Sequence, residues 1–174
     1  MAAVTDKQEI GLEVAERQLD RIMGFFPRID SKVSALFAIV SGQVAFAAVN
    51  LTIDDLKTWW VGAPAFVFLA SVAWTIINLY LCAFPHLKGG HASFVYFKEI
   101  AKLTEADYLQ KYGALDEAAL KRDVMGQIWR NSEIVALKYD YLKQATLAVM
   151  FSILPWFLLL LGTSYVHWKL PLSP

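Results

Sequence analysis

The sequence contains a single cysteine, Cys82, and carries no net charge. One cysteine excludes a disulfide within the chain and any metal cluster built from cysteines. Because sixteen basic residues are balanced by sixteen acidic ones, we do not expect a nucleic-acid polymer as a partner. Residues 1–21 are charged and lack the apolar core of a signal peptide. We therefore expect the first membrane span to act as its own insertion signal.

Motifs that would indicate an enzyme are also missing. No HExxH, Gly-x-Ser-x-Gly or phosphate-binding glycine loop occurs in the sequence. His86 and His91 lie five residues apart, whereas two histidines that bind one metal from one helix face lie four apart. We expect neither catalysis nor a bound metal or other cofactor.

Long uncharged stretches are what the sequence does contain. Residues 59–84 include no charged side chain, and roughly 20 such residues in a helix already cross a hydrocarbon core of about 30 Å. Two further apolar stretches occupy residues 33–51 and 145–168. The pattern predicts an all-α membrane protein with three transmembrane helices, at 33–51, 59–84 and 145–168. It also predicts an N-terminal amphipathic helix in 1–32, a helical domain in 85–144 and a short tail in 169–174.

The basic residues predict the orientation of these helices. Nine of the sixteen lysines and arginines lie in residues 85–144, and Arg28 and Lys32 directly precede the first span. The connection after that span contains only Lys57, and the tail only Lys169. Since Lys and Arg near short loops stay on the cytoplasmic side, we predict that 1–32 and 85–144 are cytoplasmic and that 169–174 is periplasmic.

Local signals predict where the helices outside the spans begin and end. Gly24 and Pro27 interrupt the amphipathic N-terminal helix, which predicts a kink or break just before the membrane. Thr104, with Asp107 three residues later, is typical of a helix start. Asp116 is expected to cap a long helix that continues into the third span as one rigid rod. The segment 91–102 is aromatic-rich and is also interpreted as helical.

Two polar residues interrupt an otherwise apolar stripe on this long helix. Asn131 and Lys138 lie seven residues apart on the face that carries Leu120, Val124, Ile128, Val135 and Leu142. They are consistent with fixing the register of packed helices, with a solvated face, or with a ligand site. In a ligand site the Asn131 amide would contact a base edge and the Lys138 ammonium a phosphate.

Amide side chains also occur inside the predicted spans. Gln43, Asn50 and Asn78 are expensive to expose to lipid, so they are expected to hydrogen-bond between helices or to line a water path. Three spans in one chain cannot enclose a useful pore. Any conduit therefore requires several copies, and we expect a homo-oligomer in the lipid bilayer.

Three segments together resemble a known family. The sequences FVYFKEIAKLTEADYL and QIWRNSEIVALKYDYL, with RIDSK ahead of the first span, resemble the membrane effectors of the bacterial Pycsar antiphage defence systems. The likeness covers roughly two thirds of the chain. It departs at residues 29–33, where Asp30 and Lys32 are kept but their neighbours are larger than in the family pattern.

The resemblance implies a receptor in the bacterial inner membrane rather than an enzyme. In that family a cyclase produces cyclic UMP or cyclic CMP during phage infection, and the effector senses it and impairs the membrane. The phosphate of such a nucleotide carries one negative charge, for which Arg130 and Lys138 are our candidates. Phe94, Tyr96 and Phe97 either form a core or stack on the base, with Tyr96 the favoured base contact.

The predicted cyclic-nucleotide site thus comprises Tyr96, Arg130, Asn131 and Lys138. The alternative function is a membrane scaffold or adaptor that senses no ligand and binds a partner protein through its cytosolic helices. Stabilisation of the folded protein by a cyclic nucleotide distinguishes the two hypotheses.

Overall fold

The computed structural model describes residues 11–84 and 93–169, with side chains as far as residue 166. No strand occurs among these residues. Three helical stretches are long and apolar enough to cross a membrane, which confirms the predicted fold class. The elements in chain order are α1 (Leu12–Met23), α2 (Phe25–Asn50), the short 3-10 helix η1 (Asp55–Lys57), α3 (Trp59–Ala83), α4 (Phe97–Ile100), α5 (Glu105–Gly113) and α6 (Glu117–Lys169).

The described residues divide into two compact units. Unit 1 comprises 11–27 and 93–136, and unit 2 comprises 28–84 and 137–169. The helix α6 supplies residues to both, and its 53 residues are one uninterrupted helix. The continuous helix predicted to start after Asp116 is confirmed.

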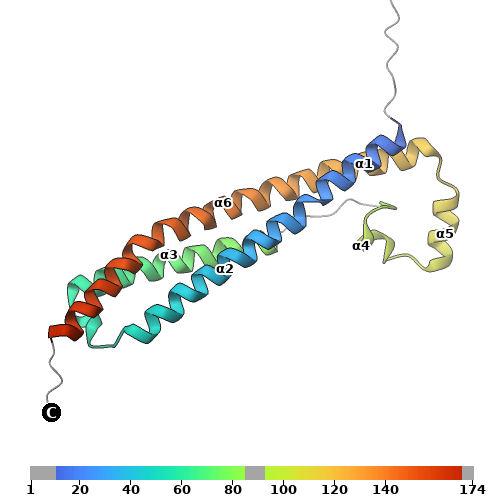
Figure 1. Ribbon diagram of the computed structural model, residues 1–174. Coiled ribbons are helices and arrows are strands. Elements are labelled where there is room, and N and C mark those ends of the chain that lie inside the picture. The colour runs from blue at the N-terminus through green and yellow to red at the C-terminus, as the bar shows by residue number, and fades with distance from the viewer. Residues whose placement is uncertain (1–10, 85–92, 170–174) are drawn as a thin grey trace, which may run out of the picture. The chain divides into compact units, whose positions relative to one another are not determined.

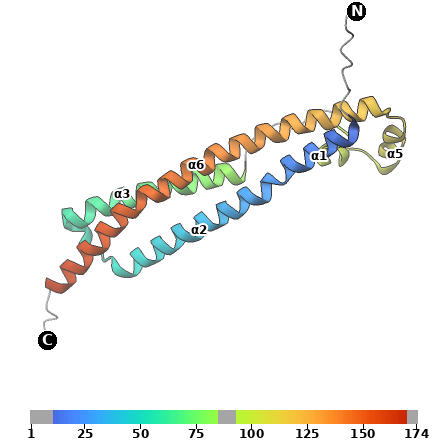
Figure 2. The same ribbon diagram turned by 45° about the horizontal axis from the view of Figure 1, so that its top comes forward.

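Unit 1 contains α1, α4, α5 and the first turns of α6. Figures 1 and 2 show α1 lying alongside the start of α6. The predicted break falls at Gly24, whose N–H donates to the Asp20 carbonyl at 2.9 Å, and α2 begins at the next residue. Pro27 thus occupies the first turn of α2, where a helix needs no N–H donor.

The predicted helix starts in unit 1 are confirmed by their hydrogen bonds. The Thr104 hydroxyl accepts the Asp107 N–H at 3.2 Å at the start of α5. The Asp116 carboxylate accepts the Ala119 N–H at 2.6 Å at the start of α6. Each contact satisfies a backbone donor that the first helical turn leaves without a partner.

The helical interpretation of residues 91–102 is wrong for most of its described part. Only Phe97–Ile100 is helical, as α4, and residues 91 and 92 lie outside the described residues. The Ser93 hydroxyl accepts the N–H groups of Val95 and Tyr96, at 3.1 and 3.0 Å, so the chain turns here instead of entering a helix. Phe94 and Tyr96 therefore lie outside a helix, and Phe97 is the first residue of α4.

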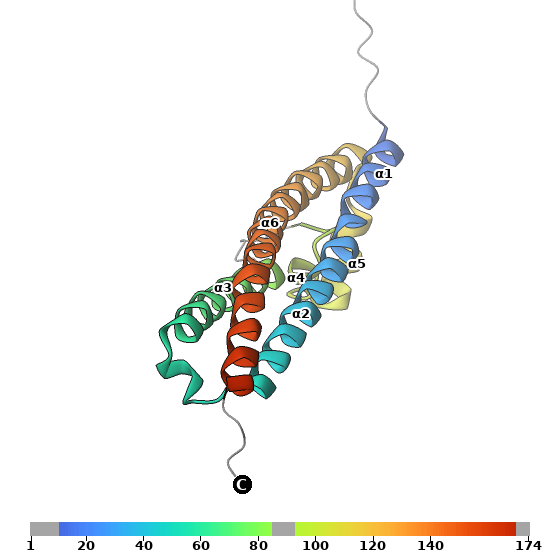
Figure 3. The same ribbon diagram turned by 60° about the vertical axis from the view of Figure 1, so that its left-hand side comes forward.

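Unit 2 is a bundle of α2, α3 and the C-terminal part of α6. Figure 1 shows the three running alongside one another, and in Figure 3 the red end of α6 lies between α3 and α2. The bundle is closed by apolar side chains from all three helices: Val40, Ala47, Ala65, Phe68, Val72, Val149 and Leu159.

Two close approaches shape the end of unit 2 where α2 turns into α3. Asp55 is buried, and its carboxylate accepts the Thr52 N–H at 2.9 Å, which fixes the turn. A Cβ atom on Gly62 would meet the Leu56 carbonyl oxygen at 2.6 Å, so only glycine fits there. A Cβ on Gly162 would lie 3.0 Å from the Val61 side chain. Because glycine has no Cβ, α6 can approach α3 closely at this position.

The amides in the predicted spans differ in their partners. Gln43 joins α2 to α6, because its side-chain oxygen accepts the Ser152 hydroxyl at 3.2 Å and its backbone carbonyl accepts the Trp156 indole N–H at 3.1 Å. The expected interhelical bond is confirmed there. Asn50 and Asn78 instead donate within their own helices, each at 2.8 Å to the carbonyl four residues earlier.

Candidate functional site

Lys138 lies in unit 2, where it connects three helices. Its side chain is 8% exposed, and its ammonium donates to the Asp30 carboxylate of α2 at 2.9 Å. The thiol of Cys82, on α3, donates to the Lys138 backbone carbonyl at 3.3 Å. A buried ammonium requires such a partner, since transfer of a lone charge out of water is very unfavourable. We call Asp30, Cys82 and Lys138 the Lys138 junction.

The segment RIDSK contacts two successive residues of α6. Asp30 pairs with Lys138, and the Lys32 ammonium lies 5.9 Å from the centre of the Tyr139 ring. Asp30 and Lys32, the two residues of this segment that resemble the family pattern, thus both contact α6. The sequence contains no signal for the Asp30–Lys138 pair, because its members are 108 residues apart.

Arg130 and Asn131 lie in unit 1 on α6. The Arg130 guanidinium is 3.4 Å from the Glu133 carboxylate and 5.0 Å from the centre of the Trp129 ring. Both members of this ion pair are more than a third exposed, at 38% and 40%. The half-buried Asn131 side chain makes no hydrogen bond to other residues that the structure describes.

Tyr96 is the residue that precedes α4 in unit 1. Its ring packs edge-on against Phe97 at a centroid distance of 5.2 Å, and Phe97 is 67% exposed. Within the described ranges, no hydrogen bond, ion pair or ring contact joins Tyr96 to Arg130 or Asn131. The four predicted site residues are therefore not gathered by direct contacts, and their role in ligand binding stays a prediction.

A buried polar network in unit 1 was missed by the sequence analysis. Ser93 is 5% exposed, and its hydroxyl accepts the Gln127 side-chain amide of α6 at 3.0 Å. The N–H of Phe94 donates to the Asp123 carboxylate, also on α6, at 2.7 Å. These contacts attach the segment before α4 to α6. They join residues 34 and 29 positions apart, a separation at which the sequence alone shows no pattern.

The network borders a small cavity with charged walls. This cavity has a volume of about 240 Å³, and Lys102 and Lys111 line it together with Glu99, Ser93, Phe94 and Leu103. Lys102 pairs with Glu99 at 2.5 Å. The cavity lining contains two ammonium groups and one carboxylate, and the Asp123 carboxylate bonds the Phe94 N–H at its border.

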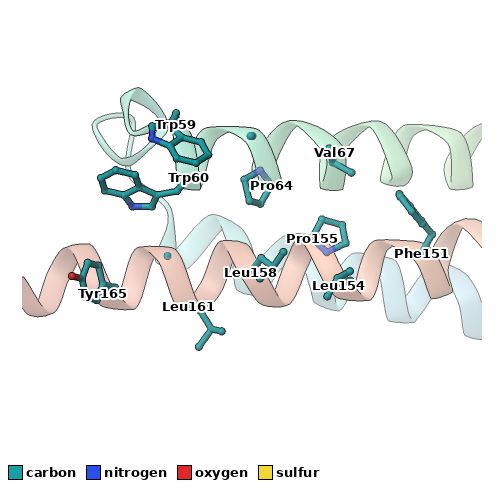
Figure 4. A pocket seen from close by; sticks show the side chains of 12 residues that line it. Trp59, Trp60, Pro64, Val67, Phe151, Leu154, Pro155, Leu158, Leu161 and Tyr165 are labelled. Atoms are coloured by element: carbon teal, nitrogen blue, oxygen red, sulfur yellow. The ribbon is translucent and has the colours of Figure 1, made fainter.

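A larger cavity lies in unit 2 and has different chemistry. It is a groove of about 1050 Å³ between α3 and α6, and Figure 4 shows Pro64 and Pro155 facing it from the two helices, with Trp59, Trp60 and Tyr165 at one end. No charged side chain lines it. A nucleotide phosphate would have no charged partner in this groove, so we do not assign the nucleotide to it.

No group of three His, Cys, Asp or Glu side chains that could hold a metal ion occurs in residues 11–84 and 93–166. His86 and His91, which the sequence analysis weighed, lie outside the described residues.

Comparison with known proteins identifies the family. The profile of the Pycsar effector protein domain matches residues 14–163, which include α2, α3 and most of α6. No curated protein and no solved structure matches the chain. Since the matched range covers most of the 174 residues, the chain belongs to the Pycsar effector family.

Proposed function

We propose that this antiphage effector binds cyclic UMP or cyclic CMP through unit 1 and then, as a homo-oligomer, impairs the bacterial inner membrane. Family membership supports the defence role. Three helices long enough to span a bilayer support a membrane location. In this proposal the chain is a receptor, and its ligand is a signal rather than a substrate.

The continuity of α6 is the observation that carries the proposal. Residues 117–136 of this helix belong to unit 1 and 137–169 to unit 2, with no break between them. A ligand can shift a conformational equilibrium only by binding one state more tightly than the other. If the favoured state of unit 1 moves or rotates its part of α6, the same helix carries that change into the span without a flexible joint.

The polar groups of unit 1 support nucleotide binding. Arg130 is held by Glu133 at 3.4 Å in a half-exposed pair, and such pairs contribute at most about 1 kcal/mol. A phosphate can therefore replace Glu133 at little cost and accept two parallel hydrogen bonds. The Asn131 amide has both a donor and an acceptor to offer a pyrimidine edge. Tyr96 offers a half-buried ring on which a base can stack.

Lys138 differs from these residues because its ammonium is buried, at 8% exposure, and is paired with Asp30 at 2.9 Å. Contact with a phosphate would require it to leave Asp30, whose side chain is 59% exposed and would then be solvated. In the proposal, Lys138 would therefore exchange Asp30 for the phosphate, whereas Arg130 and Asn131 belong to unit 1 and need not break this pair.

A titration tests ligand binding. The purified chain in detergent is heated with cyclic UMP, cyclic CMP or cyclic AMP, and unfolding is followed by circular dichroism. A ligand at a hundred times its Kd adds about 2.7 kcal/mol to the stability of the state that it binds. We expect stabilisation by one cyclic pyrimidine nucleotide and loss of it in Arg130→Ala and Asn131→Ala. Ser132→Ala, an exposed change on the same helix, is the matched control.

The scaffold hypothesis is favoured by a different observation. Unit 1 exposes several large apolar side chains, which would suit a protein partner: Phe97, Leu109, Tyr112, Met125 and Trp129. No stabilisation by any of the three nucleotides, together with membrane damage that does not depend on the cyclase, would support the scaffold function.

The orientation of the chain is tested separately with reporters. We propose a cytoplasmic unit 1 and a periplasmic C-terminus, because basic residues concentrate on the unit 1 side of the spans. An alkaline phosphatase fused after Pro174 should be active, and one inserted near Gly113 inactive. The opposite pattern would show that the orientation is the reverse of the proposed one. Activity at both sites would show that one of the three predicted helices does not cross the membrane.

A further inference from the structure

A second cavity of unit 2 combines an apolar wall with positive charge. It has a volume of about 480 Å³ and lies between α2 and α6. Its lining consists of Lys32, Ala35 and Leu36 from α2, and Tyr139, Leu142, Lys143, Thr146 and Leu147 from α6. Lys32 and Lys143 each lie one helical turn before an apolar residue of the same lining, Leu36 and Leu147. The cavity thus has a charged end and an apolar end.

Within the described ranges, the two lysines have no acidic partner. Neither forms an ion pair with a carboxylate in the part of the chain that the structure describes, and both are exposed. Lys32 lies over the Tyr139 ring, a contact that orients the ammonium without neutralising it. The nearby Asp30 carboxylate is bonded to Lys138, and Asp140 does not line the cavity. The charged end is therefore complementary to an anion.

The position of the lysines along the helices indicates the depth of this anion. Lys32 directly precedes the apolar stretch that begins at residue 33, and Lys143 precedes the one that begins at 145. Lysines at the ends of spanning helices extend toward the lipid headgroups, while their neighbours deeper in the span contact acyl chains. In a bilayer, we therefore expect the charged end of the cavity at the level of the lipid phosphates.

A neighbouring cavity shows that this chemistry is not general at that depth. The cavity between α2 and α3 has a volume of about 390 Å³ and includes Val33, Ser34 and Phe37, at the same level of α2. No charged side chain lines it. Among the described residues, the lysine pair lines the α2–α6 cavity and not the α2–α3 cavity.

We propose that the α2–α6 cavity binds an anionic phospholipid of the leaflet next to unit 1. The phosphate lies between the Lys32 and Lys143 ammonium groups, and an acyl chain lies along Leu36, Leu142 and Leu147. A zwitterionic lipid is disfavoured because its own ammonium group would approach the two lysines. A second copy of the chain in the cavity would instead make the oligomeric state depend on the two lysines. Basic cavities between spanning helices recognise anionic headgroups in this way.

Native mass spectrometry of the full chain in detergent tests the proposal. The protein is incubated with phosphatidylglycerol or with phosphatidylcholine of the same acyl chains, and bound lipid is counted. We expect preferential retention of phosphatidylglycerol and a loss of that preference on the order of tenfold in Lys32→Gln/Lys143→Gln. Lys32→Arg/Lys143→Arg, which keeps the charge, should retain it. Lys57→Gln/Lys98→Gln removes the same charge elsewhere and should also retain it.

Several results would overturn the proposal. Equal retention of the two lipids by the wild type would do so, as would an unchanged preference in the Gln double variant when its circular dichroism matches the wild type. Displacement of bound lipid by soluble glycerol phosphate at a similar concentration would assign the site to a free phosphate instead. A dimer that dissociates only in the Gln double variant would assign the cavity to a second copy.

Discussion

The two units are stabilised by different means. Nearly all of the buried large hydrophobic side chains belong to unit 2, for example Phe68 and Leu159, whereas unit 1 buries only Ala15, Ile22 and Val124 among its described apolar residues. Unit 1 relies instead on polar contacts such as Ser93 with Gln127. A unit with little buried apolar area opens at low free energy. If unit 1 binds the proposed nucleotide, the free energy of binding would be a large fraction of the stability of unit 1.

The continuous helix between the units offers the sharpest way to separate their roles. Gln144→Pro removes a backbone hydrogen bond inside α6, at a cost of about 3 kcal/mol. We expect the variant to keep nucleotide-induced stabilisation of unit 1 and to lose membrane depolarisation in cells supplied with the cyclase product. Gln144→Ala, which keeps the helix intact, should depolarise normally. Undiminished depolarisation by a well-expressed proline variant would mean that the signal travels elsewhere, for instance through Gly24 into α2.

Two glycines test how tightly each unit is packed. A Cβ at Gly62 would lie 2.6 Å from the Leu56 carbonyl oxygen, whereas a Cβ at Gly126 meets nothing within 4 Å. We expect Gly62→Ala to destabilise the protein by about 1–3 kcal/mol, because backbone must shift. Gly126→Ala should stabilise α6 by up to about 1 kcal/mol. Thermal unfolding in detergent measures both, and equal effects of the two changes would contradict the packing difference.

The Lys138 junction tests whether a buried charge stabilises unit 2. Asp30→Ala leaves the Lys138 ammonium without this carboxylate, and we expect a loss of about 2 kcal/mol, reduced from the fully buried case because Asp30 is 59% exposed. Adding Lys138→Met should recover most of this loss, since methionine needs no partner. The melting temperatures of the single and double variants give the coupling between the two residues. A double variant no more stable than Asp30→Ala would show that the pair is not the source of the effect.

Local patterns account for what could be predicted from the sequence. Apolar length identified three helices able to span a bilayer, and side-chain caps at Thr104 and Asp116 marked helix starts, because each signal lies within a few residues. The helix expected at 91–102 failed because the Ser93 hydroxyl bonds the backbone N–H groups that a helix would use.

Contacts between distant residues could not be predicted in the same way. The sequence shows that Lys138 interrupts an apolar stripe. That Asp30 is its partner follows only from how α2 packs against α6. The same holds for Gln127, which reads as an ordinary helical residue until Ser93 is placed beside it. Tertiary packing decides which of several reasons for a polar residue applies, and sequence spacing on one helix does not carry that information.

The smallest expected effect on stability compares two basic residues of the same helix. Arg130 pairs with Glu133 three residues away at 3.4 Å, in a half-exposed contact, whereas the Lys138 pair is shorter and its ammonium is buried. Glu133→Gln should therefore change stability by less than about 0.5 kcal/mol, since exposed pairs of this spacing contribute little.

If Arg130 binds the nucleotide phosphate, the Glu133→Gln change also releases the Arg130 guanidinium and removes a nearby negative charge. The affinity for the cyclic nucleotide should then rise by about two- to threefold. Isothermal titration of the wild type and Glu133→Gln measures this, with Glu105→Gln on α5 as the control. A fall in affinity would mean that Glu133 itself contacts the ligand. An unchanged affinity would mean that Arg130 does not bind the phosphate.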